Sequence, residues 1–84
     1  MNDKTNWREL EEQIGIEALP AFHRRFLATR GVENPDALPL RRVQQNVERE
    51  LNKLVLEGKA EKTEETWLVD SEIIEWLKIG VEGI

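Results

Sequence analysis

Cysteine is absent from this chain of 84 residues, and histidine occurs once. The lack of cysteine excludes disulfides, thiolate zinc sites and cysteine nucleophiles. No apolar run approaches the roughly 20 residues that a membrane span needs. The first residues, MNDKTNWREL, have neither the basic start nor the apolar core of a signal peptide. We therefore expect a cytoplasmic protein that forms one domain, residues 1–84, and has no membrane partner.

Patterns typical of enzymes are also absent from the sequence. There is no glycine loop that cradles phosphate, no zinc motif and no Ser-His-acid set at a usable spacing. Paired carboxylates such as Glu11 and Glu12 are adjacent, so their side chains diverge on a helix. We expect no catalytic residue, no metal and no cofactor. His23, beside Arg24 and Arg25, is expected to be a surface residue.

Two short helices are expected over residues 6–14 and 19–30. Apolar residues repeat at helical spacing in both, as Trp7, Leu10 and Ile14 and then Leu19, Phe22 and Phe26. Asn6 can cap the first helix, and Gly31 can end the second. Within the run FHRRF the two Phe residues are expected to point inward and the two Arg residues outward. The connector over residues 31–39 contains Asn34-Pro35, which predicts a turn or a single helical turn.

The strongest periodic pattern runs over residues 40–57 and predicts a long helix that ends at Gly58. Its apolar stripe consists of Leu40, Val43, Val47, Leu51, Leu54 and Val55. A two-stranded hairpin should follow, formed by residues 59–62 and 66–69 around a turn near Thr63. A last helix should begin near Asp70-Ser71 and stop at Gly80, with the final VEGI loose.

From Val47 the chain reads VERELNKLVLEGKAEKTEETWLV, which resembles the end of a winged-helix domain. In that superfamily a third helix of the form V-x-R-x-L-x-x-L-x-x-x-G leads into a strand, a turn and a second strand with an aromatic residue. Val47, Arg49, Leu51, Leu54 and Gly58 occupy the helical positions, and Trp67 provides the aromatic. The resemblance implies an α+β, mostly helical fold: three helices, a two-stranded wing and a C-terminal helix.

The connector departs from the usual pattern of such domains. A helix-turn-helix normally joins its helices by about 3–4 residues, whereas residues 31–39 form a longer link with two prolines. Either the link contains an extra helical turn, or the two helices cross at a different angle.

The resemblance implies that helix 40–57 is a recognition helix and that the protein binds duplex DNA in transcriptional control. Arg42, Asn46, Arg49 and Lys53 share one side of this helix at spacings of three and four residues. Arg, Asn and Gln can bond base edges, and Lys and Arg can meet phosphates. The full predicted nucleic-acid site is Arg41, Arg42, Gln45, Asn46, Arg49 and Lys53, with Lys59 and Lys62 on the wing.

Charge leaves a second interpretation open. The chain has a net charge of −5. Its bases gather in residues 22–62, whereas the segments on either side are acidic. The alternative is therefore a winged helix that binds a protein, as an adaptor or a small acidic inhibitor, through its acidic C-terminal surface. In that interpretation Trp76 and Ile79 form a protein interface or join two copies in a homodimer. A structural alternative is that Trp76 packs on Trp7.

Overall fold

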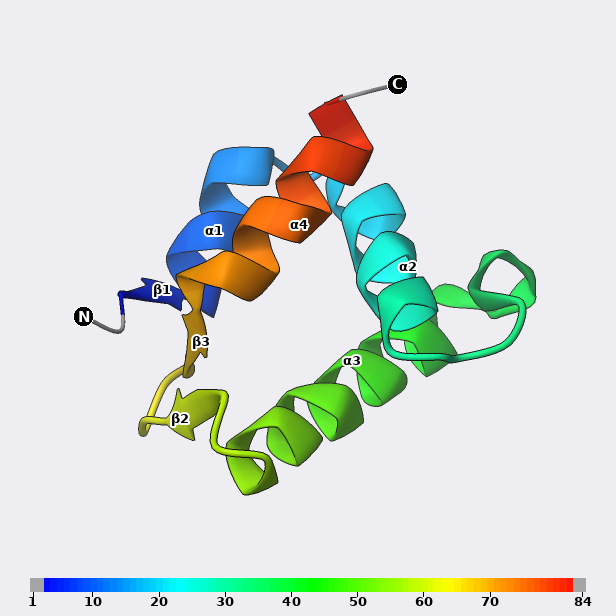
Figure 1. Cartoon of the computed structure of the whole chain (residues 1–84). Coiled ribbons are helices and arrows are strands. Elements are labelled where there is room, and N and C mark those ends of the chain that lie inside the picture. Colours follow the sequence, from blue (N-terminus) through cyan, green and yellow to red (C-terminus); the bar gives the residue numbers. More distant parts are fainter. Residues whose placement is uncertain (1–2, 83–84) are drawn as a thin grey trace.

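The computed structural model describes the backbone of residues 3–82 and the side chains of residues 3–77. Its elements are the strand β1 (Lys4–Asn6), the helices α1 (Trp7–Ile14), α2 (Leu19–Thr29) and α3 (Leu40–Leu56), the strands β2 (Ala60–Lys62) and β3 (Trp67–Asp70), and the helix α4 (Ser71–Glu82). The fold is α+β and mostly helical, with the expected hairpin and C-terminal helix. α2 lies against α3 and α4 (Figure 1). The small sheet lies where β1 leads into α1, α3 leads into β2, and β3 leads into α4.

The sheet has three strands in the order β1-β3-β2, and both pairings are antiparallel. The hairpin is confirmed, with Ala60 opposite Val69 and Lys62 opposite Trp67. The first strand was not predicted, because its three polar residues carry no strand pattern of their own. The first residue of β1 is also held by a side-chain ion pair, since Lys4 Nζ lies 2.9 Å from Asp70 Oδ1.

The hydrophobic core contains one side of every helix. Trp7 is central, with its ring centroid 5.4 Å from that of Phe22 and 5.0 Å from that of Phe26. From α3 the core receives Val43, Val47, Leu51 and Leu54, and from the sheet and α4 it receives Ala60, Val69, Ile74 and Leu77. Leu40 was wrongly placed in the stripe: as the first residue of α3 it lies a turn before the first buried position and is 54% exposed.

Glycines end three of the helices: Gly15 follows α1, and Gly31 and Gly58 follow α2 and α3, as the sequence predicts. Gly58 follows the last turn of α3 with φ of 79°, a value that L side chains rarely adopt. The amide of Lys59 then donates to Leu54 O at 2.9 Å, which satisfies a free carbonyl of the helix end. Gly31 ends α2 in the same way. The chain therefore leaves α3 abruptly into β2.

Gly80 does not stop the last helix, because α4 continues to Glu82. A glycine inside a helix costs about 1 kcal/mol relative to alanine, which lowers helix propensity without requiring a break. The prediction of a loose VEGI segment is therefore wrong for residues 81–82, and residues 83–84 lie outside the described part of the chain.

The connector contains the extra helical turn that the sequence allowed. A 3₁₀ helix, η1 (Pro35–Ala37), follows Asn34, whose φ is 49°. Arg24 fixes it to α2: its Nη2 donates to Leu38 O at 3.1 Å and its Nε to Pro35 O at 3.3 Å. Arg24 thus bonds the connector rather than pointing freely outward, whereas Arg25 is exposed as expected.

Candidate functional site

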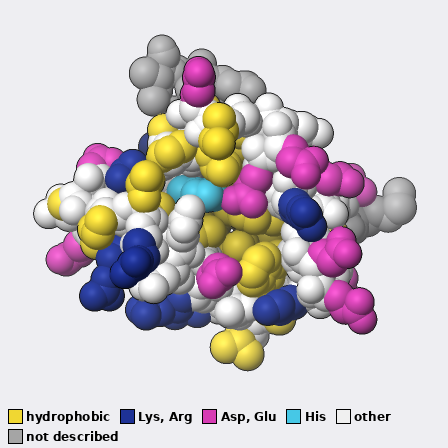
Figure 2. All heavy atoms as spheres, turned by 180° about the vertical axis from the view of Figure 1, so that it is seen from behind, with side chains coloured by type: hydrophobic (Ala, Val, Ile, Leu, Met, Phe, Trp, Pro, Cys, Tyr) yellow, Lys and Arg dark blue, Asp and Glu magenta, His cyan; other side chains and the backbone are white. Residues whose placement is uncertain are grey.

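The outward face of α3 is formed by residues opposite its buried stripe. Arg41, Gln45 and Arg49 follow one another at intervals of four and are all exposed. Their spacing puts them on one line along the helix, because four residues are close to one turn. Arg42 is exposed on the neighbouring line. In Figure 2, Lys and Arg side chains gather at the lower left, towards the beginning of α3, and acidic side chains dominate the right.

The eight predicted nucleic-acid residues differ in what they already bind. Arg41, Arg42 and Arg49 make no ion pair with any described residue. By contrast, Lys53 Nζ lies 3.0 Å from Glu50 Oε2, and Lys59 Nζ lies 3.7 Å from Glu57 Oε1. Those two ammonium groups have part of their charge balanced within the protein. The available positive charge of α3 is therefore concentrated on its three arginines.

Two amide side chains of α3 already form hydrogen bonds within the protein. Asn46 is half-buried, and its Nδ2 donates to Arg42 O at 2.9 Å. Asn52, one turn further along than Arg49, accepts a hydrogen bond of 3.2 Å from Trp67 Nε1. Gln45 is exposed and has no side-chain hydrogen bond to a described residue. Gln45 is thus the amide on this face most available to a base edge.

The wing is anchored on α3 by its tryptophan. Trp67 is half-buried against the core, and its indole donates a hydrogen bond to Asn52. Lys62 Nζ lies 5.0 Å from the centroid of the Trp67 ring, a cation–π contact. Lys62 and Lys59 are both exposed, so the wing presents two positive side chains beside the helix.

A cluster of charged side chains between the end of α2 and the C-terminal half of α3 was not predicted. Glu50 is buried, and Arg30 Nε donates to its Oε1 at 3.1 Å. The same guanidinium pairs with Glu57. The hydrogen bond that Arg30 Nη2 donates to Glu57 Oε2 raises the pKa of Arg30 above its ordinary value and lowers the pKa of Glu57 below its own. The sequence does indicate the burial of Glu50 through helical spacing. Glu50 follows Val43 by seven residues and Val47 by three, so it lies on the same side of α3 as these buried residues.

His23 is buried, which corrects the prediction that it lies on the surface. It is 7% exposed, and its Nε2 lies 2.6 Å from Glu11 Oε2. Its ring stacks on Trp7 with an interplanar angle of 8° and a centroid distance of 6.4 Å. Leu19, His23 and Leu27 are each four residues apart, so the histidine belongs to the inner stripe of α2. Glu11 supplies the polar partner that a buried imidazole requires.

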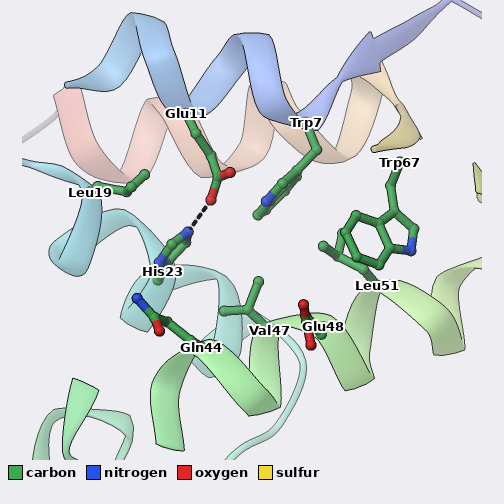
Figure 3. Close-up of a pocket in the computed structure, with 9 residues that line it drawn as sticks. All are labelled: Trp7, Glu11, Leu19, His23, Gln44, Val47, Glu48, Leu51 and Trp67. Atoms are coloured by element: carbon green, nitrogen blue, oxygen red, sulfur yellow. Dashed lines mark hydrogen bonds and ion pairs between the residues drawn. The ribbon is translucent and has the colours of Figure 1, made fainter. Parts of the chain in front are cut away.

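A hollow of about 350 Å³ opens next to this pair, between α1, α2, α3 and β3. Figure 3 shows Glu11 and His23 facing it from one side and Gln44 and Glu48 from α3. The complete lining is Trp7, Glu11, Leu19, His23, Gln44, Val47, Glu48, Leu51 and Trp67. In Figure 2 the histidine and an acidic side chain adjoin at the edge of this hollow, whose floor is hydrophobic.

Trp76 does not pack on Trp7. It lies on α4 and is 69% exposed, whereas the aromatic neighbours of Trp7 are Phe22, His23 and Phe26. The side chain of Ile79, its predicted companion, lies outside the described residues. Self-association through Trp76 therefore stays a prediction.

Among the described residues, no group of three or more His, Cys, Asp or Glu side chains is arranged to hold a metal ion. In the same part of the chain, no helix combines the length and the apolar character needed to cross a membrane. Comparison of the chain with protein-family models, with curated proteins and with solved structures gave no match.

Proposed function

We propose that this protein is a winged-helix-like domain that binds duplex nucleic acid with α3 as its recognition helix. The observation that carries the proposal is the set of three exposed arginines on α3, Arg41, Arg42 and Arg49, which make no ion pair with a described residue. Arginine meets phosphates and can also bond guanine bidentately in the major groove. A role in transcriptional control within the cytoplasm is the setting we propose for it.

The dimensions of α3 support this binding mode. An α-helix with its side chains is about 10–12 Å across, which fits a major groove about 12 Å wide. Arg41 and Arg49 are eight residues apart, so their contacts would be spread over about 12 Å along the helix. The first turn of α3 has no side-chain cap, since it follows Pro39. Its free N–H groups can therefore receive a phosphate, with Arg41 and Arg42 beside them. Lys62 on the wing would add a phosphate contact.

The net charge of −5 sets a limit on the affinity. Acidic side chains repel DNA over about a Debye length, so steering by the whole molecule is weak. Binding then depends on the few direct contacts of α3 and the wing. We expect a modest affinity with a marked dependence on salt, because each neutralised phosphate releases counterions.

Fluorescence anisotropy with a labelled duplex between about 50 and 200 mM salt tests the proposal. Wild type should bind at low salt and weaken as salt rises. Replacement of Arg41, Arg42 and Arg49 together by alanine should lower the affinity and reduce the slope by about 3. Arg8→Ala is the matched control, since Arg8 is an exposed arginine on α1. Absence of binding at low salt, or equal losses in the triple variant and in the control, would overturn the proposal.

A further inference from the structure

The hollow beside α3 is long enough for one extended side chain. Its volume of about 350 Å³ lies at the lower end of the range for ligand sites. Figure 3 shows it running from Leu19 and His23 at one end to Leu51 and Trp67 at the other. Leu19 and Trp67, which are half-buried, supply apolar surface, and the buried side chains of Val47, Leu51 and Trp7 form the floor, so the hollow suits an aliphatic stem.

The charge of the lining has one sign. Glu11 and Glu48 both line the hollow, and none of its nine lining residues is a lysine or an arginine. Glu11 Oε2 already bonds His23, whereas Glu48 is exposed and forms no ion pair with a described residue. An anionic or phosphate-bearing occupant would be repelled. A cationic group of matching length would be attracted.

The indole of Trp67, at one end of the hollow, is a suitable surface for a cation. Its indole is fixed by the bond to Asn52 Oδ1 at 3.2 Å, so the ring does not need to be ordered on binding. The ammonium of Lys62 lies 5.0 Å from the ring centroid, but Lys62 does not line the hollow, so its charge contacts the ring from outside the hollow. A planar guanidinium can stack on such a ring and also fork onto a carboxylate, which an ammonium cannot do as well.

We infer that the hollow receives the side chain of an arginine from a partner protein. Its stem would lie between Leu19 and Trp67, above the floor of the hollow, and its guanidinium would meet the carboxylate of Glu48 and the face of Trp67. This is a peptide-binding function, separate from the proposed nucleic-acid site, because it uses none of the three exposed arginines of α3. It gives the hollow a partner of defined chemistry: a basic segment with one arginine anchor.

The test uses a short peptide in which a central arginine is the only charged side chain. The control is the same peptide with citrulline in place of arginine, because citrulline has the same shape without the charge. Two-dimensional ¹H–¹⁵N spectra follow the backbone amides of Gln44 and Glu48 and the indole of Trp67. The indole of Trp76, on α4, is an internal reference because it does not line the hollow. The arginine peptide should shift the first three signals and leave Trp76 unchanged, and the citrulline peptide should bind at least about fivefold more weakly.

Glu48→Gln should weaken binding of the arginine peptide by a similar factor. Glu72→Gln removes one exposed charge from α4 and should leave binding unchanged. The inference is overturned if citrulline binds as well as arginine, or if the two variants behave alike. It is also overturned if the same signals shift on simple concentration of the protein, which would indicate a second copy as occupant. Loss of DNA binding would not affect this result, so the two proposals fail independently.

Discussion

Arg30, at the end of α2, places its Nε 3.1 Å from the buried carboxylate of Glu50 on α3. Glu50 is 5% exposed, and its second oxygen lies 3.0 Å from Lys53 Nζ. The guanidinium also reaches Glu57, the residue that follows α3. The residue that caps α2 therefore bonds one carboxylate within α3 and one at its C-cap, and it helps to fix the angle between the two helices.

Arg30→Met should destabilise the protein by about 2–3 kcal/mol, because it leaves a buried carboxylate with fewer partners. Lys53 retains its contact, which keeps the loss below that of a fully unpaired charge. Urea unfolding followed by circular dichroism measures the effect. Arg30→Met combined with Glu50→Leu should recover part of the loss, since an apolar pair has no charge to solvate. A double variant less stable than Arg30→Met alone would contradict this explanation.

The stability should also depend on acid through Glu57. The bond from Arg30 lowers the pKa of Glu57 below its ordinary value of 4.5, so the unfolded chain binds this proton more readily than the folded one. The stability that ionised Glu57 contributes is complete above about pH 4.5, and it is lost as the pH falls through the lower pKa of Glu57 in the folded protein. Unfolding between pH 7 and pH 3 should therefore show a steeper loss in wild type than in Glu57→Gln. Parallel curves for the two proteins would show that the pair contributes nothing.

Local patterns were sufficient to predict most elements of this fold. The helix α3 was expected over residues 40–57 and spans Leu40–Leu56 because a stripe of that length has one consistent phase. The hairpin was recognised from a change of period after Gly58. Both are properties of neighbouring residues, and tertiary contacts only reinforce them.

The features that were not predicted depend on contacts between distant residues. β1 has three polar residues and exists because β3, more than sixty residues away, offers a free edge. His23 is inside because Glu11 meets it, and Glu50 is inside because Arg30 does. Composition rules assign such polar side chains to the surface, and only the partner's position in space reverses that assignment. The hollow has the same origin, since four elements build it.

The cap of α1 is a further test of local structure. Asn6 Oδ1 accepts from the amides of Arg8 at 3.0 Å and Glu9 at 3.2 Å, as the sequence predicted. Asn6→Ala should cost about 1 kcal/mol, because it removes the acceptor for these amides. Asn6→Asp keeps the acceptor and should stay near wild type. Thermal unfolding of the three proteins measures the difference; an alanine variant as stable as wild type would mean that Thr66 Oγ1, which also accepts from Arg8 N, is a sufficient cap.

Leu51 tests the orientation of α3. It is 1% exposed, at the centre of the helix face that packs on the core. Leu51→Ala should destabilise the protein by about 3 kcal/mol through lost burial and a cavity. Leu51→Asp should prevent folding, because a carboxylate there has no partner. Leu56→Asp is the matched control, since Leu56 is exposed on the same helix. A soluble, folded Leu51→Asp variant would place the buried face elsewhere.

Trp76 tests whether the molecule joins a second copy. An indole that is 69% exposed offers a large apolar surface, and such residues are common at interfaces. We expect wild type to self-associate as its concentration rises in sedimentation velocity, and Trp76→Ala to remain monomeric. Because Trp76 is exposed, the substitution should change the free energy of unfolding by no more than about 0.5 kcal/mol. Loss of association would therefore reflect the interface and not the fold. A monomeric wild type over the whole concentration range would remove Trp76 from any homodimer interface.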